Sequence, residues 1–68
     1  MNIDKIKEAV QNQENYLLKR RDRIISHNGN YFEDKGFKCE AYRLLGMINI
    51  LEAAGIDAQD YKWVYNVI

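Results

Sequence analysis

The sequence predicts an all-α fold in which residues 1–68 form a single small domain, an antiparallel helical hairpin closed by a short third helix at the C-terminal end. Three observations support this prediction. Apolar residues recur at helical spacing in two long stretches, an Asn-Gly pair separates these stretches, and the chain contains no proline. Two helices joined by a short connection pack side by side in opposite directions, which gives the hairpin.

The first predicted helix begins at Asn2 or Ile3 and ends at about Ser26, with Asn2 as its N-cap. Gln13 and Arg20 are polar members of a heptad pattern in this helix. Polar residues in such a seam often set the register or the oligomeric state of paired helices. The apolar members of the pattern are Ile3, Ile6, Val10, Leu17 and Ile24, and the stripe is widened by Leu18 and Ile25.

The connection from His27 to about Gly36 contains two chain breakers. The run Asn28–Asn30, with glycine at its centre, is a strong turn signal, and Gly36 is predicted to be the second breaker. Tyr31 and Phe32 lie between the two breakers and are expected to fold back onto the helices. The Asn-Gly pair also suits a β-hairpin, but an isolated hairpin is weak in water, so a loop is the preferred prediction.

The second predicted helix runs from Phe37 to Ala54, and Gly55 is predicted to be the glycine that ends it. Small residues, Gly46 and Ala53 among them, are expected to let another backbone approach closely. The apolar face consists of Phe37, Ala41, Leu44, Ile48 and Leu51, flanked by Leu45 and Ile50. This pattern predicts that one face of the helix packs against the first helix.

The segment from Ile56 to Ile68 supports two interpretations. Asp57 is a suitable N-cap, and Asp60 three residues later suits a capping box, which favours a helix. Residues 61–68 are rich in β-forming residues, and strict alternation would place the aromatic residues on one side of a strand. The helix is preferred, because a strand would find no partner strand within the chain.

Composition excludes several classes of function. The formal net charge is zero, and the chain has one cysteine, Cys39, and one histidine, His27. These two residues cannot form an internal disulfide or supply the four protein ligands of a structural zinc site. The sequence contains no glycine-rich phosphate loop, no Ser/His/Asp set and no carboxylate pattern for calcium or di-iron. We therefore expect no enzymatic activity, no metal and no cofactor.

The remaining compositional features predict a cytoplasmic protein that forms a homodimer. No apolar run approaches the ~18 residues that a membrane span requires, and Met1–Lys5 lacks the pattern of a signal peptide. A lone cysteine fits a reducing compartment. A domain of 68 residues buries only about 60% of its unfolded surface, so a second copy of the chain is expected to stabilise it.

Charge is unevenly distributed although it sums to zero. The cluster from Lys19 to Arg23 and the later residues Lys35, Lys38 and Arg43 meet at one end of the predicted hairpin. Seven basic and four acidic residues gather there, against three basic and six acidic residues at the opposite end. Three interpretations compete: complementation of the helix dipole, docking onto an acidic protein or a phosphate-bearing ligand, and binding to nucleic acid.

The aromatic C-terminal segment is the second candidate surface, because Tyr, Trp and Arg dominate binding hot spots. Its structural alternative is a segment that closes the hairpin core. The predicted partner-binding residues are Lys19, Arg20, Arg23, Arg43, Tyr61, Trp63 and Tyr65. We refer to Tyr61, Trp63 and Tyr65 as the aromatic tail.

The run from Glu40 to Gly55 resembles, in general character, small accessory proteins of phages and mobile elements. This resemblance implies an accessory factor or antagonist. The resulting hypothesis is a small non-catalytic helical interaction protein that binds a partner protein with an acidic surface and modulates or inhibits it. The alternatives are a protein that binds nucleic acid or a phosphate ligand through the basic end, and a self-assembling structural protein.

Overall fold

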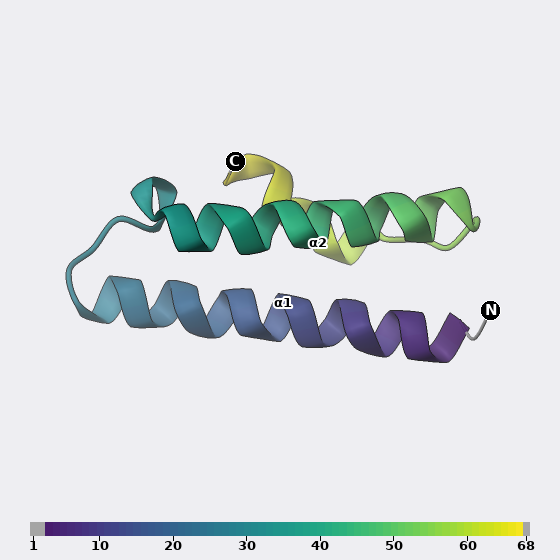
Figure 1. Cartoon of the computed structure of the whole chain (residues 1–68), viewed down its shortest axis with the longest axis horizontal. Helices are drawn as coiled ribbons and strands as arrows, with labels where there is room; N and C mark the ends of the chain where they lie inside the picture. The colour runs from purple at the N-terminus through teal and green to yellow at the C-terminus, as the bar shows by residue number, and fades with distance from the viewer. Residues whose placement is uncertain (1–2, 68) are drawn as a thin grey trace.

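The computed structural model describes residues 3–67. These residues form two long helices, α1 (Ile3–Ser26) and α2 (Lys35–Ala53), and two 3-10 helices, η1 (Tyr31–Glu33) and η2 (Gln59–Asn66). Figure 1 shows α1 and α2 lying side by side in opposite directions. The prediction of an all-α hairpin with a short third helix is confirmed, and the described part of the chain contains no strand.

The helix α1 ends at the predicted Asn-Gly turn, but glycine is not the residue that adopts the left-handed conformation there. Asn28, not Gly29, adopts the left-handed conformation, with a φ of 60°. The Gly29 N–H donates a hydrogen bond to the carbonyl of Ile24 at 2.9 Å. A Cβ atom on Gly29 would lie 2.9 Å from Ile24 Cγ2, so glycine is required there for close approach. The predicted cap at the other end, Asn2, lies outside the described residues.

The helix α2 begins at Lys35, earlier than predicted, and Gly36 lies inside its first turn. The prediction that Gly36 breaks the chain was therefore wrong. The reason is the N-cap Asp34, whose carboxylate accepts a hydrogen bond from the Phe37 N–H at 2.6 Å. In the preceding loop Tyr31 packs edge-on against Phe37, with ring centroids 5.4 Å apart, whereas Phe32 is 46% exposed.

The other end of α2 confirms the predicted glycine stop. Gly55 has a φ of 77°, which is the left-handed region that favours glycine. The Ile56 N–H donates to the Leu51 carbonyl at 2.9 Å, and the Gly55 N–H donates to the Glu52 carbonyl at 3.0 Å. These two hydrogen bonds form a Schellman motif, which satisfies carbonyls at the end of the helix and turns the chain toward η2.

The C-terminal segment is helical, but it is a 3-10 helix rather than an α-helix. Ala58, Tyr61, Val64 and Val67 recur at every third position, and three of them are buried while Tyr61 is half-buried. Side chains three residues apart eclipse in a 3-10 helix, so this spacing places all four on the hairpin. The predicted capping box was wrong: Ala58 is the N-cap, and Asp57 instead accepts the Gln59 N–H at 2.9 Å.

The core lies between α1, α2 and η2. All five residues of the predicted α2 face are buried, while α1 contributes Val10 and Leu17. The radius of gyration is 12.6 Å, above the roughly 11 Å expected for a compact chain of this length. The extents of 41 × 18 × 17 Å describe a rod, so much of the hairpin surface stays uncovered. Gly46 is exposed, with nothing within 4 Å of its Cβ position, so no backbone approaches it here.

The two polar residues of the α1 heptad pattern form hydrogen bonds within the same chain. Gln13 binds to α2, and Arg20 binds to the connection between the two helices. The Gln13 amide donates to the Glu40 carboxylate at 2.8 Å and to the Glu40 carbonyl at 3.0 Å. The Arg20 guanidinium donates to the Asp34 carboxylate at 3.2 and 3.3 Å. These contacts fix the register of α1 against α2, which is one of the two roles that the sequence pattern predicted.

Candidate functional site

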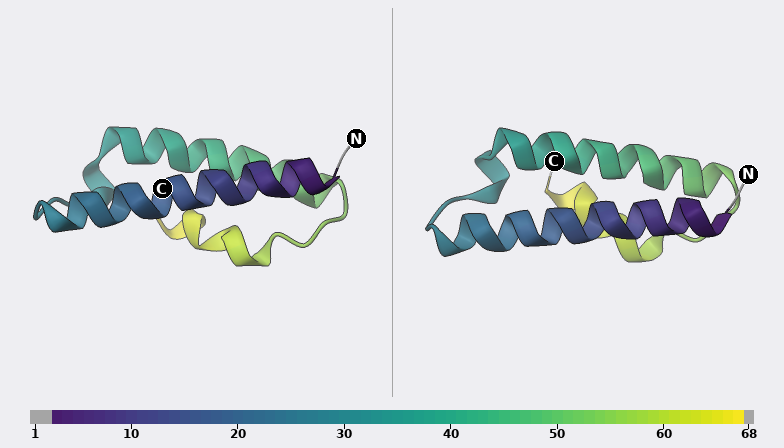
Figure 2. Two further views of the ribbon diagram at one scale, coloured as in Figure 1. Left: turned by 90° about the horizontal axis from the view of Figure 1, so that it is seen from below. Right: turned by 60° about the horizontal axis from the view of Figure 1, so that its bottom comes forward.

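The hairpin has two long sides, and η2 packs against only one of them (Figure 2). We call this side the covered face. Its contacts with η2 come from Gln11, Glu14 and Arg21 of α1 and from Glu52 of α2. We call the opposite side the open face. The open face includes Ala9, Tyr16, Arg23 and Ile50. Each of them is two positions in sequence from a residue that contacts η2. A step of two residues rotates the side-chain direction by about 200° around an α-helix, so these four point to the opposite side.

The aromatic tail is divided between packing and exposure. Trp63 is half-buried, and its indole N–H donates to the Glu14 carboxylate at 2.9 Å. The Arg21 guanidinium lies over the Trp63 ring, 5.9 Å from its centroid. Tyr61 is also half-buried, whereas Tyr65 is 44% exposed. Two of the three residues therefore help close the hairpin, and Tyr65 alone points its ring substantially into solvent.

The environment of Tyr61 is apolar and negatively charged. Its hydroxyl donates to the side-chain oxygen of Gln11 at 3.4 Å. Burial raises the pKa of the Tyr61 phenol above its ordinary value, and the carboxylates of Glu14 and Asp60 raise it further. The phenol is therefore held in its neutral form, as suits a packing residue at the edge of the core.

Three of the predicted binding residues do come together. Lys19, Arg20 and Arg23 line a groove of about 130 Å³ together with Tyr16, which is 48% exposed. We call these four residues the basic groove. They lie on one side of α1 because their spacing of three, four and seven residues follows the helical turn. Among residues 3–67, Lys19 and Arg23 form no ion pair with a carboxylate.

Arg20 differs from its two neighbours because Asp34 holds it in place. The Asp34 carboxylate raises the pKa of the Arg20 guanidinium. The Phe37 N–H, and after it Arg20, lowers the pKa of the Asp34 carboxyl. The guanidinium lies over Gly36 so closely that a Cβ atom there would collide with it. Gly36 thus makes room for the Arg20–Asp34 pair, a role that sequence reasoning missed.

Arg43 lies apart from the basic groove. Its side chain is 65% exposed and pairs at 3.8 Å with Glu40, the residue that also receives the Gln13 hydrogen bond. The structure thus gathers three of the four predicted basic residues in one groove and leaves the fourth, Arg43, outside it.

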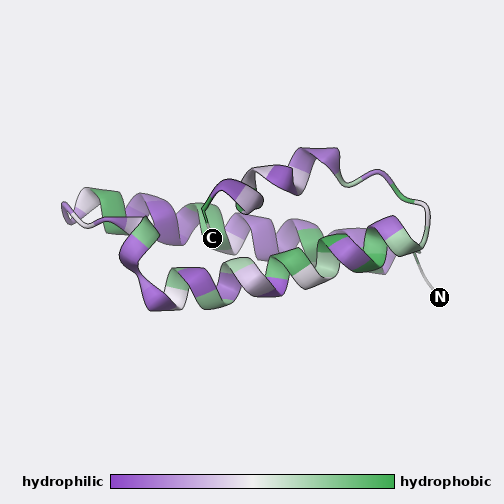
Figure 3. Ribbon diagram, turned by 90° about the horizontal axis from the view of Figure 1, so that it is seen from above, coloured by the Kyte–Doolittle hydropathy of each residue, from purple (hydrophilic) through white to green (hydrophobic). Residues whose placement is uncertain are grey.

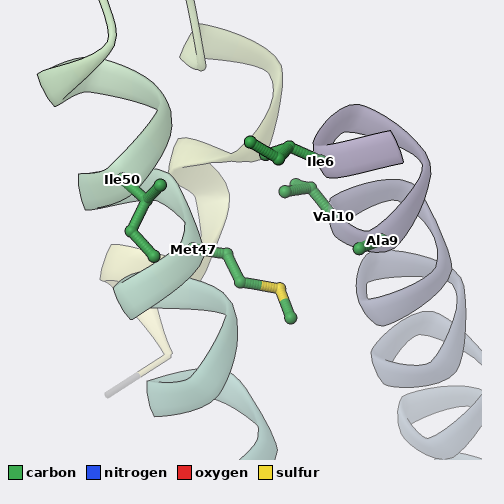
Figure 4. A pocket seen from close by; sticks show the side chains of 5 residues that line it. All are labelled: Ile6, Ala9, Val10, Met47 and Ile50. Atoms are coloured by element: carbon green, nitrogen blue, oxygen red, sulfur yellow. The ribbon is translucent and has the colours of Figure 1, made fainter. Parts of the chain in front are cut away.

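The open face also holds an apolar pocket that the sequence reasoning did not assign. Its volume is about 300 Å³, and its lining residues are Ile6, Ala9, Val10, Met47 and Ile50. Figure 4 shows Ile6, Val10 and Met47 reaching toward one another between the two helices. Ile50 is 54% exposed at the edge of the pocket. The available signal was the concentration of apolar residues in the C-terminal half of α2, which Figure 3 displays.

Other chemistry finds little support in the described residues. Among residues 3–67, no three His, Cys, Asp or Glu side chains gather as a metal site would require. Cys39 is an exposed free thiol. Neither α1 nor α2 is long and apolar enough to cross a membrane, judged on the described part of the chain. The open face of the described residues carries one basic groove and one apolar pocket.

Comparison with models of protein families, with curated proteins and with solved structures found no match to this chain.

Proposed function

We propose that this chain is a small non-catalytic helical interaction protein. Its basic groove binds an acidic surface of a partner protein, and occupation of that surface modulates or inhibits the partner. The observation that carries the proposal is the pair of cations without an ion-pair partner among residues 3–67, Lys19 and Arg23, beside Tyr16 and Arg20 in one groove.

Two other basic residues of the predicted basic end, Arg21 and Arg43, differ from this pair. Arg21 lies over Trp63, and Arg43 pairs with Glu40, so these two charges are engaged within the chain. Lys19 and Arg23 can instead pair with incoming carboxylates, which accelerates association and aligns the partner. Tyr16 adds an exposed aromatic ring to the same groove, and tyrosine beside arginine is a frequent composition of binding hot spots.

The test is a charge reversal with a matched control. Lys19→Glu with Arg23→Glu reverses the groove, and Lys35→Glu with Lys38→Glu makes the same change in net charge on exposed residues of α2 outside it. The wild-type chain, immobilised, captures a partner from a lysate of its source cells, and the purified partner is then titrated. We expect the dissociation constant to rise by about tenfold or more for the groove variant.

The control variant should change the same dissociation constant by less than about threefold, because exposed charges outside a contact act only through screened long-range fields. Circular dichroism should show unchanged helicity for both variants. Equal losses of affinity in the two variants would contradict the assignment to the groove.

Nucleic acid is the second candidate ligand, since an exposed tyrosine between basic side chains suits stacking on single strands. The acidic residues at the same end weigh against it. The dependence of the binding affinity on salt concentration distinguishes the two kinds of ligand. The affinity for nucleic acid should fall by roughly 0.7–0.9 log units per log unit of salt for each phosphate contacted, and a protein partner anchored by apolar contacts should respond less steeply.

Self-assembly is the third candidate function, and a homodimer would also offset the small core. Tyr65, Tyr42 and Phe32 are exposed aromatic residues outside the basic groove and suit such a contact. Light scattering at low and high salt measures the solution mass directly. A mass that doubles with concentration, without any captured partner, would favour self-assembly over the primary proposal.

A further inference from the structure

We infer that the open face receives one amphipathic helix of the partner protein, whose apolar side chains enter the pocket and whose carboxylates meet the basic groove. This inference rests on the proposed function and adds the form of the ligand. It joins two features that lie on the same side of the hairpin, the apolar pocket and the basic groove.

The pocket supplies the apolar part of the argument. It lies between two antiparallel helices, all five of its lining residues are apolar, and Ile50 stays 54% exposed at its rim. A groove between two helices is a surface on which an amphipathic helix can lay its apolar face. On the covered face the corresponding groove is already filled by η2, a helix of the same chain.

The distance between the two features predicts a spacing in the ligand. On α1 the pocket is centred near residue 8 and the basic groove near residues 19–20. This separation of about eleven residues corresponds to roughly 17 Å along the helix axis. Eleven residues also make about three full turns of an α-helix. A helix lying along the open face therefore presents both parts from one side, with its acidic residues about eleven positions from its apolar anchor.

Charge complementarity is the reason to commit to a partner protein with free carboxylates. The carboxylates of Glu14 and Glu52 lie on the covered face, where Trp63 and Lys62 engage them. Glu40 is engaged by Gln13. A second copy of this chain would therefore have to use other carboxylates, such as the exposed Asp4 and Glu8. A partner helix with free Asp or Glu residues matches the groove directly, and a crosslink to a second copy is one of the outcomes tested below.

Photo-crosslinking tests the inference on the full chain. The photoreactive residue p-benzoylphenylalanine replaces Ile50 at the pocket, and in a control it replaces Tyr42, which is 59% exposed and outside the pocket. After irradiation in a lysate of the source cells, mass spectrometry identifies the crosslinked segment. At position 50 we expect a segment with apolar residues at helical spacing and Asp or Glu about ten to twelve residues from the crosslink.

A synthetic peptide of that segment is then titrated against the wild type and two variants. We expect Ile50→Glu to weaken binding by about tenfold or more, because it places a charge in the apolar contact. Tyr42→Glu should weaken it by less than about twofold. A crosslink to a second copy of this chain, to nucleic acid, or to a segment without the acidic residues would overturn the inference.

The two proposals fail in different ways. If Lys19→Glu with Arg23→Glu abolishes capture while position 50 yields no crosslink and Ile50→Glu binds normally, the basic groove stands and the helical ligand is wrong. If the charge reversal has no effect on capture, the proposed function is wrong, and with it the acidic half of this inference.

Discussion

The covered face and the open face belong to the same pair of helices, yet η2 packs against only the first of them. On the covered face Trp63 donates to Glu14 and Lys62 pairs with Glu52 at 3.7 Å, so the polar groups of η2 find partners in the hairpin. On the open face Lys19 and Arg23 have no ion-pair partner within residues 3–67, and Ile50 is half exposed. The covered face thus contributes packing to the fold, and the open face is the one on which the proposed binding site lies.

The unequal division has a simple structural origin. The third helix, η2, is eight residues long and follows α2 after a short connection, so it can cover only one side of the hairpin. Val64 of η2 and Val67, directly after its end, are buried and complete the core on that side.

Val64→Asp should have the largest effect. Val64 is fully buried, so the substitution places a carboxylate in the core with no partner, and we expect the free energy of unfolding to fall by about 3 kcal/mol or more. Ile50→Asp makes a similar chemical change at a side chain that is 54% exposed, and it should cost less than about 1 kcal/mol. Urea denaturation followed by circular dichroism measures both values.

The outcome bears directly on the two faces. If Ile50→Asp were as destabilising as Val64→Asp, the apolar pocket would belong to the stabilising core, and its role in binding would lose its basis. The comparison also requires that the two variants give similar denaturant slopes, since a changed slope signals a changed unfolded or native state.

Substitutions of Trp63 should cause the next largest loss of stability. They also test whether the aromatic tail serves packing or binding. Trp63→Phe keeps an aromatic ring but removes the hydrogen bond to Glu14, and it should cost about 1 kcal/mol. Trp63→Ala also removes the packing and the contact with Arg21, and it should cost about 2–3 kcal/mol. Thermal and urea denaturation measure the losses.

The same two variants should leave the affinity for the acidic partner unchanged under conditions where they stay folded. The Trp63→Phe variant keeps its ring packed. A clear loss of affinity in this variant would therefore indicate that the aromatic tail is part of the binding site, as the sequence alone predicted. Tyr65→Ala is the companion variant, because Tyr65 is 44% exposed and its loss should affect stability little.

The sequence predicted the parts of the fold that follow from periodicity and turn chemistry. The helical spacing of apolar residues located both long helices, and Gly55 located the end of α2. The misassigned Gly36 shows the limit. Asp34, two residues earlier, is an N-cap by residue type, but only the structure shows that the Arg20 guanidinium occupies the space beside Gly36. This is a contact between residues far apart in sequence.

The candidate site was predictable to a similar extent. The spacing of Lys19, Arg20 and Arg23 on one helix already placed them together, and the structure confirms this grouping. The apolar pocket could not be predicted, because it depends on which side of the hairpin η2 occupies. In the sequence, Ile50 and Met47 cannot be distinguished from other apolar residues that flank the core face of a helix. Only the position of η2 on the other side of the hairpin shows that they stay uncovered.

The smallest effect concerns Arg20, the one member of the basic groove that is paired within the chain. The pKa of Asp34 is held below its ordinary value of 3.8, first by the Phe37 N–H and then by Arg20. A lowered pKa means that the carboxylate contributes stability above its unfolded-state pKa, and that this contribution is lost as the pH falls through the folded-state pKa. The midpoint of thermal unfolding should therefore drop in this acidic range.

Asp34→Asn isolates this contribution, since asparagine is an equally good N-cap but carries no charge. We expect a midpoint lower by a few degrees at neutral pH and a shallower decline toward acid than in the wild type. Asp22→Asn is the matched control, because the Asp22 side chain is 72% exposed and should not alter the profile. If Asp34→Asn instead followed the wild-type profile, Arg20 would be as unpaired as Lys19 and Arg23. The open face would then carry three free cations, and its contrast with the covered face would be larger than the structure indicates.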